Sequence, residues 1–137
     1  MGRHFKRKLR QSLKYKHEYE GEKYRNLLKL EVAKVLAESG VQFEYERMFR
    51  CGGKFYFPDF TTNSAIIECT YWDDVAQRAK ELRRKIEDYT KSGLGRVFIV
   101  TFHEYKQKYS RSLHGSNAMV IIPETLREMM GGKTGRV

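Results

Sequence analysis

No run of apolar residues in the chain approaches the roughly 18 that a membrane-spanning helix requires, and no apolar region follows the basic start as it would in a secretory signal. We therefore expect a cytoplasmic protein with no membrane partner. Cysteine is also scarce, since Cys51 and Cys69 are the only two and neither belongs to a CxxC or CxxH cluster. They cannot form a zinc site by themselves, and we interpret them as structural thiols of a reducing compartment.

Acidic residues are absent from the first seventeen positions, although these positions carry seven lysines and arginines. The whole chain has 27 basic and 17 acidic residues and a formal net charge of +10, so residues 18–137 hold 20 basic residues against all 17 acids. A basic N-terminal arm binds a polyanion by releasing its counterions, which predicts a nucleic acid as partner. The residues that we expect at its phosphates are Arg3, Lys6, Arg7, Lys8 and Arg10. An acidic membrane surface is the alternative, for which Phe5, Leu9 and Leu13 supply only a narrow apolar face.

One hydrophobic core is expected in a chain of 137 residues, so residues 18–132 are predicted to be a single domain and residues 133–137 a flexible tail. Apolar residues at helical spacing predict a helix over residues 18–39 that ends at Gly40, and period-two alternation predicts a strand over residues 41–46. The other expected elements are a hairpin turn at 50–54, strands at 55–62 and 65–71, a helix from Asp73 or Asp74 to Lys91, strands at 96–102 and 118–122 with a loop between them, and a helix at 123–130 stopped by Gly131 and Gly132. This order predicts an α/β fold with a central mixed sheet flanked by helices.

Two acidic residues lie in apolar surroundings. Asp59 follows Pro58 at a predicted strand end, and Glu68 lies inside the apolar run Ala65–Thr70 of the next strand. Burying a carboxylate is unfavourable unless an ion or another partner compensates its charge, and hydrolysis of a phosphodiester uses a hard divalent cation held by such oxygens. We therefore predict that Asp59 and Glu68 hold a metal ion, with the Cys69 carbonyl as a third ligand. The alternative is that Asp59 only caps a turn and Glu68 lies on a solvated face or pairs with an arginine.

A known family resembles residues 36–70, LAESGVQFEYERMFRCGGKFYFPDFTTNSAIIECT. This is the PD-(D/E)xK nuclease superfamily, within which phage junction-resolving endonucleases look most similar. The shared features are a helix that ends at Gly, a strand of FEYE type, a PDF motif and an apolar strand with E-x-K. The resemblance implies a restriction-endonuclease-like core of order α-β-β-β-α-β, magnesium or manganese at Asp59 and Glu68, branched (Holliday-type) DNA as a substrate, and a homodimer.

The chain departs from the family pattern at two positions. The motif lysine, two residues after Glu68, falls at Thr70, and the glutamate of the first helix falls at Lys29. The family is known to move this lysine to a neighbouring element. Because residues 85–89 (KIEDY) resemble its Q-x-x-x-Y element, we predict Lys85 as the catalytic lysine. The other candidates for the lysine are Lys80, Arg83 and Arg84 of the same helix and Lys29 itself, and those for the glutamate are Glu22 and Glu31.

Together these residues predict a magnesium-dependent DNA endonuclease in which Asp59, Glu68 and Lys85 are catalytic. The main alternative is a non-catalytic nucleic-acid-binding protein whose nuclease site was lost when Thr70 replaced the lysine. A third class is an adaptor that uses the basic arm alone, on RNA or on a membrane surface.

Overall fold

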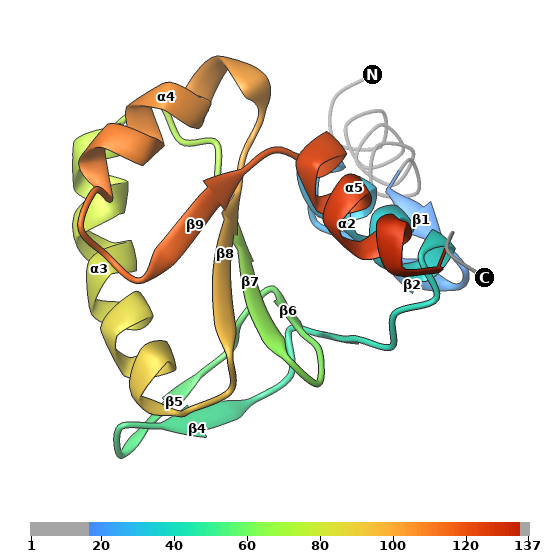
Figure 1. Cartoon of the computed structure of the whole chain (residues 1–137), viewed down its shortest axis with the longest axis horizontal. Helices are drawn as coiled ribbons and strands as arrows, with labels where there is room; N and C mark the ends of the chain where they lie inside the picture. The colour runs from blue at the N-terminus through green and yellow to red at the C-terminus, as the bar shows by residue number, and fades with distance from the viewer. Residues whose placement is uncertain (1–16, 135–137) are drawn as a thin grey trace, which may run out of the picture.

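The computed structural model describes residues 17–134 of the chain and the side chains of residues 17–131 (Figure 1). Most of the predicted basic arm and the end of the predicted tail, residues 135–137, therefore lie outside the described residues. The arm residues concerned are Arg3, Lys6, Arg7, Lys8 and Arg10. Their contact with a nucleic acid stays a prediction from the sequence.

A five-stranded sheet, of order β3-β6-β7-β8-β9, forms the centre of the described part of the chain. The strands are β3 (Glu44–Tyr45), β6 (Phe60–Thr61), β7 (Ala65–Cys69), β8 (Arg96–Val100) and β9 (Ala118–Ile121). β6 pairs antiparallel with β3 and β7, whereas β7, β8 and β9 are parallel. The connections between the parallel strands contain helices, as such crossovers usually do. The predicted α/β fold with a mixed central sheet is confirmed, and its restriction-endonuclease-like identity stays a prediction.

Two helices cover each face of this sheet (Figure 1). The helices are α2 (Leu27–Glu38), α3 (Val75–Lys91), α4 (His103–Ser112) and α5 (Pro123–Thr134). α2 and α5 lie on one face, and α3 and α4 on the other. Successive side chains of β7 alternate between these faces, so Ile67 packs in the core under α2 and Ile66 in the core under α3. Glu68 has the phase of Ile66, and its side chain therefore leaves β7 on the side of α3.

A separate hairpin lies below the C-terminal end of α3 in Figure 1. It consists of β4 (Phe49–Cys51) and β5 (Lys54–Tyr56), which pair antiparallel. The predicted turn between them is confirmed, and Gly52 and Gly53 have the positive φ values, 59° and 74°, that such a turn needs. The single strand predicted over residues 55–62 is wrong. Pro58 has no N–H to donate, and the chain leaves the hairpin after Tyr56 and joins the central sheet only at β6.

The first predicted helix is too long, because residues 18–23 form a small hairpin instead. Its strands are β1 (Glu18–Tyr19) and β2 (Glu22–Lys23). Glu20 and Gly21, between them, both have positive φ, which no α-helix accommodates. α2 begins at Leu27, where the side chain of Asn26 accepts a hydrogen bond from the Lys29 N–H at 2.9 Å.

Three further predictions about element boundaries are wrong. The strand predicted over residues 41–46 is only Glu44–Tyr45, and the loop predicted between the last two strands contains α4. Only Tyr109 of α4 is fully buried, so this helix has no apolar stripe for a sequence pattern to reveal. α5 does not stop at residue 130 but continues through two glycines to Thr134, because glycine weakens a helix without forbidding it and α5 packs along α2.

Candidate active site

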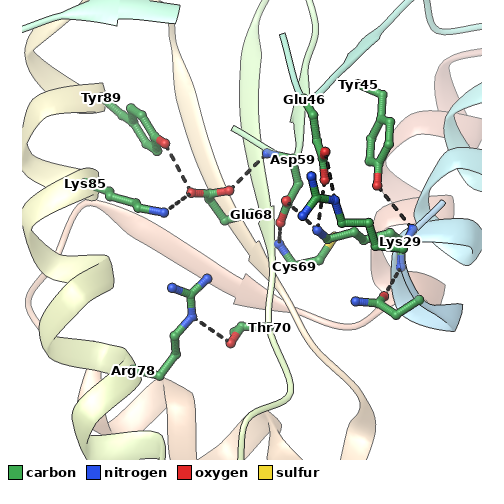
Figure 2. A network of polar contacts seen from close by, with 12 residues as sticks. Lys29, Tyr45, Glu46, Asp59, Glu68, Cys69, Thr70, Arg78, Lys85 and Tyr89 are labelled. Atoms are coloured by element: carbon green, nitrogen blue, oxygen red, sulfur yellow. Dashed lines mark hydrogen bonds and ion pairs between the residues drawn. The ribbon is translucent and has the colours of Figure 1, made fainter. Parts of the chain in front are cut away.

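Asp59 and Glu68, the two predicted metal ligands, lie side by side where β6 and β7 pair (Figure 2). Both are buried, with 8% and 2% of their surface exposed. The Asp59 N–H donates to Glu68 Oε1 at 3.0 Å, and the Cys69 N–H donates to Asp59 Oδ2 at 2.7 Å. Each carboxylate thus accepts a hydrogen bond from a backbone N–H of the segment that carries the other carboxylate. The pairing of two adjacent strands therefore fixes the relative position of these two acids.

The second oxygen of Glu68 faces α3. Lys85 Nζ lies 3.3 Å from Glu68 Oε2, and the Tyr89 hydroxyl donates to the same oxygen at 3.1 Å. Lys85 and Tyr89 reach it together because residues four apart lie on one face of a helix. Lys85 is therefore beside Glu68, as a catalytic lysine would have to be, and its role in catalysis stays a prediction.

Burial raises the pKa of the Glu68 carboxyl, and the charge of Asp59 raises it further. The Lys85 ammonium, the Asp59 N–H and the Tyr89 hydroxyl oppose this shift without cancelling it. Burial and then the charge of Glu68 also raise the pKa of Tyr89, so that the tyrosine stays a neutral hydrogen-bond donor at physiological pH. Glu68 consequently binds a proton more readily than an ordinary glutamate does.

Lys29, at the start of α2, neutralises Asp59. Its Nζ lies 3.1 Å from Asp59 Oδ1 and 3.1 Å from Glu46 Oε2, and Arg25 Nε lies 3.1 Å from the other oxygen of Glu46. Burial lowers the pKa of Lys29, but Asp59 and Glu46 together raise it more, so the net shift is upward. Lys29 is therefore a charged member of the site that contacts Asp59, whereas Lys85 contacts Glu68.

Glu46 is an acid of the site that the sequence did not single out. It directly follows β3, and its N–H donates to the Asp59 carbonyl oxygen at 3.0 Å. No local motif marks it, since only the pairing of β3 with β6 brings it to Asp59. The glutamates suggested for the missing first-helix acid lie elsewhere. Glu22 is exposed in β2, and Glu31 lines a groove together with Pro123 of α5.

Thr70, which stands where the family has its lysine, is buried and joined to a cation. Its hydroxyl accepts a hydrogen bond from Arg78 Nε at 3.2 Å and forms another with the Tyr109 hydroxyl at 3.1 Å. Arg78 extends from α3 on the same side of β7 as Lys85 (Figure 2). Arg78 was not among the residues predicted from the sequence. The sequence does contain a signal for it, because residues 78, 85 and 89 are separated by seven and four positions and therefore lie on one face of a helix.

Among the described contacts, none of the other suggested cations of α3 reaches the two carboxylates. Arg83 donates to the carbonyl oxygens of Ser112 and His114 at 2.8 Å and 2.9 Å, where it closes the C-terminal end of α4. Lys80 and Arg84 are exposed. Of the four cations that the sequence suggested on this helix, Lys85 is the one in contact with Glu68.

The carboxylate oxygens at the site are of the kind that a hard divalent cation prefers. Mg²⁺ is commonly held by one or two carboxylates together with water and substrate phosphates, and Asp59 and Glu68 are the residues that would hold it. The described residues contain no group of three or more His, Cys, Asp or Glu side chains arranged to hold a metal. All four carboxylate oxygens have a hydrogen-bonding or ionic partner, and two of these partners are lysines. The Cys69 carbonyl stays a predicted third ligand.

Comparisons of the chain with models of protein families, with curated proteins and with solved structures found no match. The resemblance to the PD-(D/E)xK superfamily therefore rests on the sequence motifs alone. Within the described residues, no helix is both long enough and apolar enough to cross a membrane.

Proposed function

We propose that the chain is a metal-dependent endonuclease that hydrolyses phosphodiester bonds in DNA, with branched (Holliday-type) DNA as its substrate. The observation that carries the proposal is the buried pair of Asp59 and Glu68, with Lys85 Nζ 3.3 Å from Glu68. A buried ion pair is weak evidence of a stabilising role, and a buried acid whose pKa is raised beside a second acid is typical of catalytic sites. Their arrangement on adjacent strands supports a function over a purely structural role.

The roles that we propose follow from these contacts. Asp59 and Glu68 would hold Mg²⁺ or Mn²⁺, and such an ion polarises the phosphate and lowers the pKa of an attacking water. Lys85 would stabilise negative charge that develops on the phosphate, since its ammonium lies at the edge of the carboxylate pair. Tyr89 and Lys29 act as positioning residues, because the first fixes the orientation of Glu68 and the second that of Asp59.

Charge supports DNA as the partner. The formal net charge of +10 is carried largely by the first seventeen residues, and a basic arm of this kind supplies sequence-independent contacts to phosphates. The homodimer belongs to the proposal only through the family resemblance.

Cleavage of plasmid, four-way-junction and single-stranded DNA in Mg²⁺ or Mn²⁺ tests this function. We expect the wild type to cleave at least one of these substrates, and Asp59→Asn and Glu68→Gln each to reduce the rate by about a hundredfold or more. The matched controls are Asp73→Asn and Glu87→Gln, which make the same chemical changes at exposed positions of the described chain. Thermal unfolding of all four variants shows whether they fold. Cleavage that survives both site substitutions would remove the assignment.

A second function keeps the DNA partner without the chemistry. Thr70 stands at the position of the motif lysine, and both carboxylates are already paired with lysines, as in a stable polar network. These contacts favour a non-catalytic nucleic-acid-binding protein with a decayed nuclease site. If the wild type binds DNA but cleaves none of the substrates with either metal, this second function replaces the first.

A further inference from the structure

The β4–β5 hairpin has one packed face and one free face. Its strands pair Phe49 with Tyr56 and Arg50 with Phe55. The first pair packs under α3, where the rings of Phe49 and Tyr56 lie 6.2 Å and 5.3 Å from that of Tyr89. Because side chains alternate along a strand, the second pair points the opposite way. The hairpin is therefore anchored to the helix that carries Lys85 and presents its other face outward.

The outward face is unusually apolar for an exposed surface. Met48, Phe55 and Phe57 are 62%, 59% and 62% exposed. They share the phase of Arg50, whose guanidinium lies 5.6 Å from the centre of the Phe55 ring. Two exposed phenylalanines on one face of a two-stranded ribbon contribute nothing to the core and call for a partner.

The charge of the hairpin restricts what that partner is. Residues 47–57 contain Arg47, Arg50 and Lys54 and no acidic residue, and all three cations are exposed. Arg50 lies on the outward face, whereas Lys54 has the phase of the packed face and lies 4.0 Å from Asp88 Oδ2. A second copy docking through the outward face would bring the Arg50 side chains of the two copies toward one another, which opposes association. A polyanion that offers flat apolar surfaces satisfies both features. The bases and phosphates of a nucleic acid have this combination, and exposed bases stack on aromatic side chains.

The hairpin also leads directly into the candidate active site. Glu46 lies just before it and Asp59 just after it, and the Glu46 N–H donates to the Asp59 carbonyl oxygen at 3.0 Å. Phe57 is thus two residues from Asp59 in the chain. The Phe57 end of the outward face is therefore the end that leads to Asp59.

We propose that the outward face of the β4–β5 hairpin binds unpaired bases of DNA, with Phe55 and Phe57 stacking on them and Arg50 contacting the neighbouring phosphate. The inference rests on the DNA partner of the proposed function and adds a substrate preference to it. Bases inside a continuous duplex are already stacked on one another, so this face selects single strands and the open centre of branched DNA over intact duplex.

Binding measured in EDTA tests the inference without any cleavage. The probes are a fluorescent single strand, the same strand with abasic sites, and the intact duplex, each with the full-length chain. We expect Phe55→Ala and Phe57→Ala to weaken binding to the single strand by about fivefold to a hundredfold each. Binding to the duplex and to the abasic strand should change by less than about twofold, since both substitutions leave the phosphate contacts intact.

Two further variants complete the design. Phe55→Trp preserves stacking and should bind the single strand as tightly as the wild type does. The fluorescence of the introduced indole should be quenched when the strand binds. Met119→Ala removes an exposed apolar side chain of β9 and is the control that should leave all binding unchanged. Equal losses on single strand, abasic strand and duplex would overturn the inference, and so would no loss at all.

Failure of this inference and failure of the endonuclease proposal are distinguishable. A wild type that cleaves DNA while both phenylalanine variants bind like the wild type overturns only the hairpin inference. If the wild type binds DNA in a base-dependent way but cleaves no substrate, the hairpin inference is supported and the endonuclease proposal is removed. Dissociation of a dimer in sedimentation of Phe55→Ala or Phe57→Ala would assign the face to a second copy instead and overturn the inference.

Discussion

Replacing Lys85 with methionine should destabilise the protein at neutral pH and less in acid. The change removes the ammonium that lies 3.3 Å from Glu68 Oε2 and keeps most of the length of the aliphatic side chain. At an effective dielectric constant of about 20, this separation corresponds to a gross attraction of about 5 kcal/mol. Lys85 is 33% exposed, so water screens part of the attraction, and ordering its side chain costs up to about 2 kcal/mol. We expect a net loss of about 1–2 kcal/mol.

The pH dependence of this loss follows from the raised pKa of Glu68. A carboxyl whose pKa is raised on folding contributes stability at low pH and loses it as the pH rises through the folded value. The ammonium of Lys85 offsets this loss only when Glu68 is ionised. Because the pKa of Glu68 lies above that of an ordinary glutamate, more than half of the folded wild type is protonated at Glu68 at pH about 4.5, and the ion pair that Lys85→Met removes is weaker there than at neutral pH.

Urea unfolding followed by circular dichroism measures the effect at pH about 4.5 and about 8. Lys80→Met is the matched control, because Lys80 is exposed on the same helix. Lys85→Met should lose about 1–2 kcal/mol at the higher pH and less than that at the lower, with no such difference for the control. An equal loss at both values would show that Lys85 does not stabilise the Glu68 carboxylate.

Three other outcomes are expected. Calorimetry should find that affinity for Mn²⁺ rises up to about tenfold per pH unit until Glu68 is ionised, because the metal competes with a proton, and an affinity independent of pH would exclude Glu68 as a ligand. Deleting residues 1–17 removes seven basic side chains and should reduce the slope of log K for DNA binding against log salt concentration by as much as about 6. A slope equal to that of the wild type would show that the arm is not the binding element. Asn26→Ala should cost about 1 kcal/mol in urea unfolding by removing the cap of α2, against little for Asn63→Ala in an exposed turn; equal losses would contradict the capping role.

Much of the fold was predictable because its central elements carry strong local patterns. The apolar stripe of α3 follows from its periodicity, the two parallel strands after it from short apolar runs with β-branched residues, and the β4–β5 turn from paired glycines. The errors lie where local pattern and packing disagree. Residues 18–23 contain good helix formers, but Gly21 makes a turn there, and α4 has a single fully buried side chain, so its polar sequence looked like a loop.

The candidate site was predictable only in part. Asp59 and Glu68 were recognised because a carboxylate in apolar surroundings requires a partner, and Lys85 from a short motif on the next helix. Glu46 and Arg78 were not found, and the reason is physical. Glu46 reaches the site through strand pairing between distant segments, which no adjacent residues encode. The spacing of Arg78 from Lys85 and Tyr89 places it on their helix face, but its contact with Thr70 depends on the packing of α3 against β7.

The central claim is that Asp59 and Glu68 form a metal-dependent phosphodiesterase site. It is tested most directly by the rate of Mg²⁺-dependent cleavage of a four-way junction by Glu68→Gln, compared with Glu87→Gln under the same conditions. We predict that Glu87→Gln stays within about twofold of the wild type, because its partner Lys91 lies on the exposed surface, and that Glu68→Gln loses about a hundredfold or more. Equal rates for the two variants would contradict the claim.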